Sequence, residues 1–147
     1  MRTTFRPTEH SGSFASAELL CIDPARVSEF WPYVAPLLKA AVLKTDLCKF
    51  AEIEHQTLSG AGLLWIAWSG RIEAAAATVI TETDRARVCV LTACGGTDRK
   101  RWLPLLEKIE AYARDQGCSV LRILGRRGWQ RVLRKYRITN VVLERQL

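Results

Sequence analysis

A glycine pair followed by three consecutive cations is the part of this sequence best suited to chemistry. Gly95-Gly96 precedes Arg99-Lys100-Arg101, and an amphipathic pattern predicts a helix from about Arg101 to Gln116. Backbone amides at a helix start bind anions, so we expect a site for phosphate-like groups here. Cys94 could act as a nucleophile near those amides, but no histidine is close in sequence, and a buried thiol is the favoured interpretation.

Two apolar segments flank this helix. Val88–Ala93 precedes it and Ser119–Leu124 follows it, after a stop at Gly117. A strand, a turn, a helix and a further strand make a βαβ unit, so we expect the two strands to be parallel neighbours in a sheet covered on both faces. The spacing of the helix predicts one buried stripe, formed by Leu105, Leu106, Ile109, Tyr112 and Ala113.

The rest of the chain supplies elements to complete the sheet. Residues 1–12 are polar and form an expected N-terminal arm, and residues 13–147 form one expected α/β domain with a mixed sheet, in the order β-α-α-β-β-β-α-β-α-β. The expected elements are a strand at 13–22, a helix at 23–43 kinked or split by Pro32 and Pro36, a helix at 46–58, a hairpin of 63–68 and 72–83 around Ser69-Gly70, a basic helix at 127–135 and a last strand at 139–145.

The composition excludes several classes of protein. No apolar run approaches the roughly 18 residues of a membrane helix, and the N-terminus lacks the apolar core of a secretory signal. The five cysteines show no CxxC spacing, which favours a reducing, cytoplasmic compartment. His10 and His55 lie far apart, so no metal site is expected.

The net charge of +7 is concentrated at the C-terminal end. Residues 118–147 hold eight Lys and Arg residues against a single acidic one, Glu144. Such a face attracts anionic partners, whether a cofactor, nucleic acid or an acidic protein surface, or it is a solvated basic surface.

The segment Leu105–Cys118 (LLEKIEAYARDQGC) resembles the central helix and following turn of the GNAT superfamily, the acyl-CoA-dependent N-acyltransferases. The expected order of elements after residue 12 is also that of the GNAT fold. The resemblance implies that acetyl-CoA, if bound, lies against the strand before the central helix, with its pyrophosphate at the helix start. The residues it assigns to the cofactor are Ala93, Cys94, Gly95, Gly96, Arg99, Lys100 and Arg101.

The resemblance leaves the catalytic groups open. Glu73 and Glu82 on the central strands are candidate bases, and Tyr136 lies close to, but about one turn from, the position of the tyrosine common in the family. The family's glycine-rich motif aligns with Thr97–Trp102, which contains no glycine. Asp98 and Trp102 are expected to intrude on a phosphate there, so we expect acetyl-CoA binding to be weak or absent.

A second short motif, Gly125-Arg126-Arg127-Gly128-Trp129, resembles a divergent branch of GNAT-like proteins encoded by tailed bacteriophages. Its glycines permit a tight turn, and Trp129 can anchor the basic helix to the core. Arg126, Arg127 and Arg131, with Trp129, are therefore candidate partner-binding residues, suited to phosphate or to a carboxylate-rich surface.

Three functions remain open from the sequence. The favoured one is a GNAT-like domain with a degenerate acyl-CoA site, acting without catalysis as a binding or structural component of a phage particle, with no cofactor. The alternative is an N-acyltransferase that moves an acyl group from acyl-CoA to an amine. The third is a nucleic-acid-binding module, for which the chain shows no motif. The N-terminal arm favours an oligomer or assembly, because a polar arm is seldom ordered unless something holds it.

Overall fold

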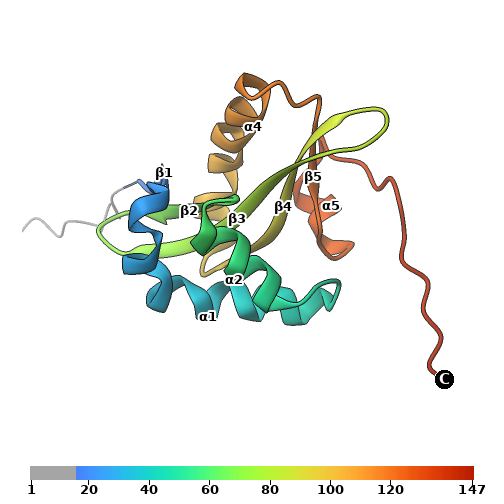
Figure 1. Cartoon of the computed structure of the whole chain (residues 1–147), viewed down its shortest axis with the longest axis horizontal. Helices are drawn as coiled ribbons and strands as arrows, with labels where there is room; N and C mark the ends of the chain where they lie inside the picture. Colours follow the sequence, from blue (N-terminus) through green and yellow to red (C-terminus); the bar gives the residue numbers. More distant parts are fainter. Residues whose placement is uncertain (1–15) are drawn as a thin grey trace, which may run out of the picture.

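The computed structural model describes residues 16–147 and contains one five-stranded mixed sheet (Figure 1). The strands lie in the order in which they occur along the chain. Neighbouring strands are antiparallel except the last two, which are parallel, and this confirms the expected βαβ unit. The strands are β1 (Glu18–Cys21), β2 (Gly62–Trp68), β3 (Ile72–Glu82), β4 (Arg87–Gly96) and β5 (Val120–Ile123).

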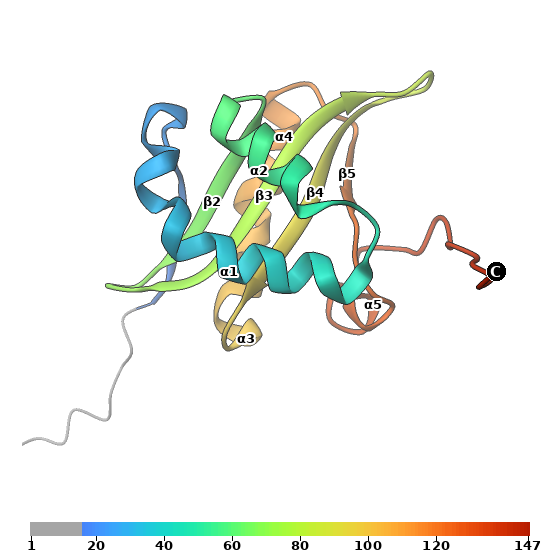
Figure 2. The same ribbon diagram turned by 60° about the horizontal axis from the view of Figure 1, so that its bottom comes forward.

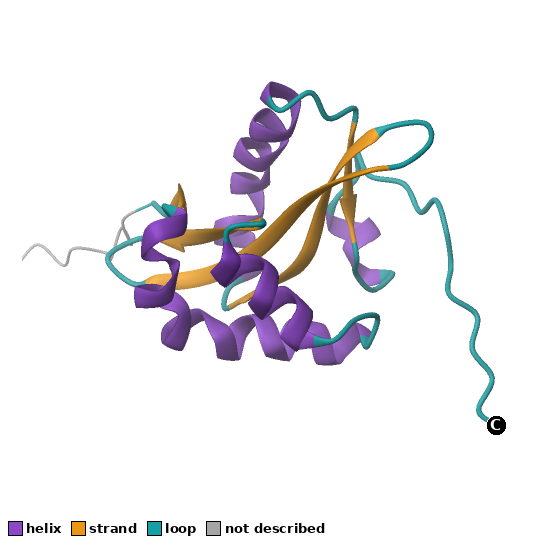
Figure 3. Cartoon of the chain, in the orientation of Figure 1, coloured by secondary structure: helices purple, strands orange, loops and turns teal. Residues whose placement is uncertain are grey.

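Helices cover both faces of the sheet (Figures 2 and 3). The first face carries α1 (Val27–Thr45) and α2 (Phe50–Ser59), and the second carries α4 (Leu106–Asp115). Two short helices, α3 (Arg99–Trp102) and α5 (Gly128–Val132), lie near the ends of β4 and β5, and 3-10 turns occupy Pro24–Arg26 and Leu103–Leu105.

Alternation along β3 supplies both cores. Ala75 and Ala77 face α1 and α2, while Ala74 and Ala76 face the opposite layer. All four alanines are buried, and their small side chains allow the large residues of the helices and of β2 to pack closely on the sheet. Trp65 exemplifies this packing, because its ring meets Tyr112 edge-on at 5.2 Å.

Asp23 accepts a hydrogen bond from the amide of Ala25 and caps the 3-10 turn Pro24–Arg26, from which α1 continues at Val27. Pro32 and Pro36 do not split it. The helix continues to Thr45 and changes direction along its length (Figure 2), which is how a helix absorbs the clash of a proline ring. Its buried apolar residues are Val27, Trp31, Val34, Leu38 and Val42.

Several expected boundaries are wrong. Gly95-Gly96 is not a turn but the end of β4, paired with Ala75 and Ala74, and the turn falls at Thr97–Asp98. The central helix starts earlier than expected and is interrupted by a 3-10 turn at Leu103–Leu105, where Pro104 has no N–H to donate. The second helix starts at Phe50 rather than Asp46, because Asp46 adopts a left-handed conformation that ends α1.

The C-terminal part differs most from expectation. Helix α5 ends at Val132 rather than near Lys135, and residues 139–145 form no strand. A strand needs a neighbour to bond with, and this segment leads away from the body (Figure 1), so its backbone has no ladder partner among residues 16–147. The expected N-terminal arm, residues 1–12, lies outside the described residues. No helix in residues 16–147 is long and apolar enough to cross a membrane.

Candidate functional site

The parallel strands β4 and β5 pair along only half of β4. Their register runs from Val88 opposite Val120 to Leu91 opposite Ile123. The last bond between them is donated by the Leu124 amide to the Leu91 carbonyl at 3.2 Å. Strand β4 then continues to Gly96 with β3 alone as its partner. Its other edge is therefore left without a strand partner within the described part of the chain.

A β-bulge marks the point where the two strands part. Opposite β3 the register passes from Ala77–Ala93 to Thr78–Leu91, so Thr92 is the extra residue. Its hydroxyl donates to the Ala77 carbonyl at 3.2 Å. A bulge bends its strand and increases its twist. The bulge at Thr92 therefore accounts for β4 leaving β5 directly after Leu91.

A cleft of about 920 Å³ opens where the strands diverge. Helix α1 forms one wall of the cleft, and the part of β4 that has no partner in β5 forms the floor. The segments that follow β4 and β5 form the remaining sides. This volume lies within the range of about 300–1,000 Å³ typical of small-molecule sites. The residues contributed by α1 are Pro36, Leu37, Ala40, Ala41, Lys44 and Thr45.

The lining of the cleft is basic. Lys44, Arg99, Lys100 and Arg126 supply four cations from three separate parts of the chain, and Asp98 is the one carboxylate among the described lining residues. Cations placed around a cleft with apolar walls raise the local concentration of anions. The arrangement suits a ligand that is anionic at one end and narrow enough at the other to lie along β4.

The structure brings most of the predicted cofactor residues to this cleft. Ala93, Cys94, Gly95, Gly96, Arg99 and Lys100 all line it. Arg101 does not, because its guanidinium turns to the Glu73 carboxylate at 2.8 Å. Lys44 was missed, since a lysine on the polar side of an amphipathic helix gives no sequence signal of its own.

Glu73, a candidate base from the sequence, is placed behind the cleft rather than in it. It is the extra residue of a second bulge, where β2 and β3 pass from Ala67–Ala74 to Trp68–Ile72. Its side chain is only 2% exposed and one oxygen is held by Arg101. Its carbonyl also accepts the Thr97 amide at 3.0 Å. Glu73 therefore supports the turn after β4.

Glu82 and Tyr136, the other two candidates, do not line the cleft. Glu82 is exposed at the far end of β3, where it pairs with Arg87 at 3.0 Å. Tyr136 is half-buried, and burial, followed by the nearby Glu110 carboxylate of α4, raises its pKa. Neither side chain is placed to exchange a proton with a ligand in the cleft.

Cys94 lines the cleft but is not activated there. Burial raises the pKa of its thiol to about 12. The thiolate is the nucleophilic form, so at neutral pH this side chain is an uncharged thiol. That agrees with the favoured interpretation from the sequence.

Trp102 and Asp98 leave more room than the sequence suggested. The Trp102 ring is buried beside Ala67 and Ala74, and its Nε1 donates to the Thr97 carbonyl at 2.9 Å. It borders the cleft without filling it. Asp98 is exposed at the left-handed turn, with φ of 49°. We expected Trp102 to intrude on a phosphate at the start of the helix. The structure corrects this expectation, because the Trp102 ring packs into the core.

Trp129 closes the cleft on the side of α5. Its ring packs against Trp102 at 6.1 Å, so it anchors α5 to the core as predicted, and the Arg99 guanidinium lies 5.9 Å from the ring centre. A Cβ on Gly125 would lie 2.6 Å from Trp129 Cδ1, which explains the glycine there. Of the three predicted partner-binding arginines, Arg126 lines the cleft, and Arg127 and Arg131 are exposed beyond it.

The structure is similar to solved acetyltransferases. A probable acetyltransferase matches with a TM-score of 0.64 and 14% identity, covering 88% of this chain and 99% of that one. A predicted acetyltransferase from Clostridium acetobutylicum, solved with acetyl-CoA, matches with a TM-score of 0.62 and 14% identity, covering 88% and 96%. An aminoglycoside acetyltransferase from an uncultured soil metagenomic sample, solved in complex with trehalose, matches with a TM-score of 0.63 and 10% identity. The match covers 90% of this chain and 97% of that one.

These similarities show that the chain has the GNAT acetyltransferase fold. At such low identity they show the fold alone. No protein-family model and no curated protein matches the chain. In residues 16–147 no group of three or more His, Cys, Asp or Glu side chains could hold a metal ion.

Proposed function

We propose that this chain binds an acyl-CoA in the cleft between β4 and β5 and transfers its acyl group to an amine. The observation that carries the proposal is the separation of the two strands after Leu91. It leaves the edge of β4 from Thr92 to Gly96 open to a ligand, under a wall formed by α1. The similarity in fold to acetyltransferases, one of them solved with acetyl-CoA, supports the same function.

The residues of the cleft fit such a ligand. An acyl-CoA has a narrow amide-containing arm and a phosphate-bearing end. The arm matches the unpaired main-chain groups of β4, because each buried N–H and C=O needs a partner. The phosphates match Lys44, Arg99, Lys100 and Arg126, which line the cleft.

The chemistry required is simple. The bound thioester supplies an activated acyl carbon: the amine nitrogen forms a bond to it, the carbon–sulfur bond breaks, and the thiolate leaves and takes up a proton. The open β4 edge would orient the arm, and α1 would keep water from one side of it. Asp98 is the one carboxylate in the described lining, so the proton of the amine passes to it or to solvent.

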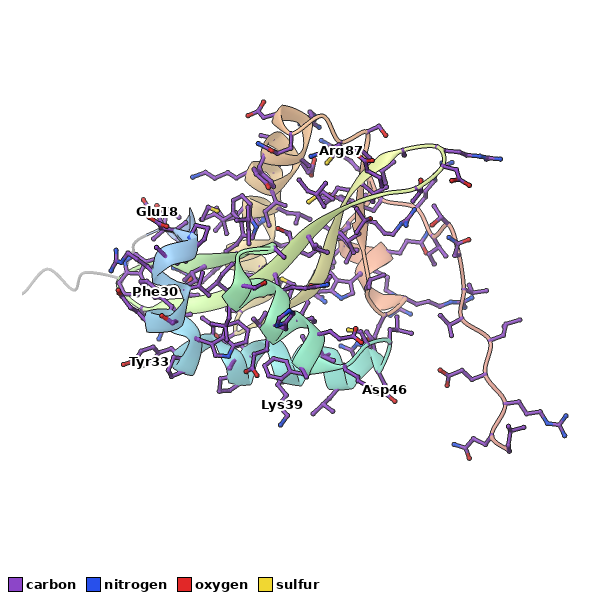
Figure 4. The ribbon with its side chains drawn as sticks, in the orientation of Figure 1. Glu18, Phe30, Tyr33, Lys39, Asp46 and Arg87 are labelled. Carbon is purple, nitrogen blue, oxygen red and sulfur yellow. The ribbon has the colours of Figure 1, made fainter. Side chains whose placement is uncertain are left out.

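Calorimetric titration of the full chain with acetyl-CoA and with CoA tests the proposal. We expect saturable binding, weakened roughly tenfold by the double substitution Lys44→Gln and Arg99→Gln, since each removes a charge-assisted contact to phosphate. Lys39→Gln is the matched control, because Lys39 is exposed on α1 and points away from the sheet (Figure 4). No binding by the folded wild-type chain contradicts the proposal.

A second candidate is the non-catalytic role favoured by the sequence, as a binding or structural component of a phage particle. One observation supports it: Arg127 and Arg131 are exposed, and neither joins an ion pair within residues 16–147. Clustered guanidinium groups suit an acidic protein surface. Triple substitution of Arg126, Arg127 and Arg131 by Gln would then weaken assembly and reduce its salt dependence, with folding unchanged.

An assay of acyl transfer distinguishes the two candidate functions. Release of free CoA thiol from acetyl-CoA, measured over a panel of amines, supports the transferase. No release of CoA thiol with any amine, together with salt-sensitive assembly, supports the binding component.

A further inference from the structure

A second cavity lies on the face of the sheet opposite α1, beneath the segment that runs from α3 into α4 (Figure 2). Its volume is about 30 Å³, and we call it the α4 cavity. A cavity needs roughly 10–15 Å³ to hold one water molecule, so the α4 cavity has room for about two groups of that size. Its lining includes Leu19, Ala67, Ala74, Ala76, Leu106 and Ile109.

The α4 cavity is apolar. None of the described residues that line it is charged, and burial raises the pKa of the Cys94 thiol to about 12, so that group stays protonated. Trp65 Nε1 donates to Thr78 Oγ1 at 2.9 Å. Trp102 Nε1 donates to the Thr97 carbonyl, also at 2.9 Å. With these donors already engaged, the lining suits an apolar group better than an ordered water.

The α4 cavity adjoins the cleft. Four residues line both spaces: Leu91, Cys94, Trp102 and Trp129. Leu91 marks the point where β5 stops pairing with β4. Past Leu91 no described strand fills the space beside that edge of β4, so the two spaces lie next to each other where the strands part.

The proposed ligand has a direction in the cleft. Arg99 and Lys100, which match its phosphates, follow the end of β4 at Gly96. A ligand that lies along the open edge of β4 with its phosphates there brings its acyl end toward Leu91, at the other end of that edge. The acyl group therefore arrives beside the α4 cavity.

We propose that the α4 cavity receives the acyl chain, and that the acyl-CoA used by this protein carries a straight chain of three or four carbons rather than acetyl. This inference rests on the proposed function and adds the class of acyl donor. One or two methylenes beyond acetyl match the volume of the cavity. Each methylene moved from water to an apolar site favours binding roughly fourfold. A much longer chain has no room there and would force core side chains apart.

Alanines on β3 leave the space open. Ala76 is buried in the same cluster as Leu91 and Ile109 and lines the α4 cavity. Valine at this position adds two methyl groups and would fill the cavity. Ala77, the next residue, faces α1 and lines neither the cavity nor the cleft. Ala77→Val is therefore the matched control for Ala76→Val.

Calorimetric titration of the full chain with CoA, acetyl-CoA, butyryl-CoA and octanoyl-CoA tests the inference. We expect butyryl-CoA to bind roughly tenfold more tightly than acetyl-CoA, and octanoyl-CoA to bind more weakly than butyryl-CoA. Ala76→Val should bring the ratio of the butyryl-CoA and acetyl-CoA affinities close to one, and Ala77→Val should retain the wild-type ratio. The ratio is the readout because a general loss of stability affects both ligands alike.

Leu106→Ala makes the opposite change. It enlarges the α4 cavity and should shift the preference toward octanoyl-CoA, which keeps the test decisive if Ala76→Val does not fold. Binding of acetyl-CoA or octanoyl-CoA at least as tight as that of butyryl-CoA to the wild type overturns the inference and leaves the proposed function standing. So does a preference for butyryl-CoA that neither variant changes. If no acyl-CoA binds, the proposed function and the inference fall together.

Discussion

The guanidinium Nε of Arg101 lies 2.8 Å from Oε1 of Glu73 and joins the first turn after β4 to the start of β3. The carboxylate is 2% exposed and the guanidinium 23%. Breaking a pair of this kind leaves a buried charge without its partner, which costs far more than losing a surface pair. The pair therefore stabilises the segment that carries Arg99 and Lys100 into the cleft.

Arg101→Ala should destabilise the protein by about 3 kcal/mol, because the buried Glu73 carboxyl group would lose its partner. Arg87→Ala, which removes the exposed pair with Glu82, is the control and should cost less than about 1 kcal/mol. Urea unfolding of both variants measures the difference. Equal losses would show that the buried pair contributes no more to stability than the exposed pair.

Gly95→Ala should disturb the wall of the cleft. A Cβ at Gly95 would lie 2.6 Å from the Leu37 carbonyl, so α1 must move away from β4. We expect a loss of about 1–3 kcal/mol, as for other overpacked sites, and weaker ligand binding in the cleft. Gly128→Ala is the control, since nothing lies within 4 Å of its added Cβ. An unchanged melting temperature for Gly95→Ala would contradict the close approach.

The loss of stability on truncating a side chain of α4 to alanine should increase with the burial of that side chain. Ile109 is 2% exposed in the core beneath α4, whereas Leu106 is half-buried. Ile109→Ala should therefore cost about 2–5 kcal/mol, and Leu106→Ala clearly less. Leu58→Ala, at a residue 42% exposed on α2, should be close to neutral. Denaturant midpoints at constant slope establish the order, and a larger loss at Leu106 would contradict the packing.

Stability should fall at alkaline pH because of Cys94. Its pKa is 9.0 ordinarily and about 12 in the folded chain. Between these values the unfolded chain holds fewer protons than the folded one, so unfolding becomes more favourable as pH rises. Melting temperatures between about pH 8 and pH 11 should fall less steeply in Cys94→Ala. Some loss will persist, since burial also raises the pKa of Cys89, to about 11. An identical pH profile would show that Cys94 does not titrate in this way.

The sequence alone determined the class of fold and most of the local elements, although the expected strand at 139–145 does not form. Apolar periodicity predicted the hairpin of β2 and β3, and the βαβ pattern made β4 and β5 parallel neighbours. These features depend on spacing along one segment, which a single sequence displays directly. The boundaries at Gly95-Gly96 and at Asp46 were missed. Gly95 and Gly96 pair with Ala75 and Ala74 of β3, and Asp46 adopts a left-handed conformation that ends α1.

Only the tertiary structure decided what surrounds the cleft. Lys44 and Arg126 are far apart along the chain and meet because α1 crosses the point where β4 leaves β5. The same packing turned Trp102 into the core and Arg101 toward Glu73, although the sequence placed both residues beside Lys100 at the site. Side-chain direction at the end of a strand depends on bulges and on the partners that cover it, and neither is encoded in the local pattern.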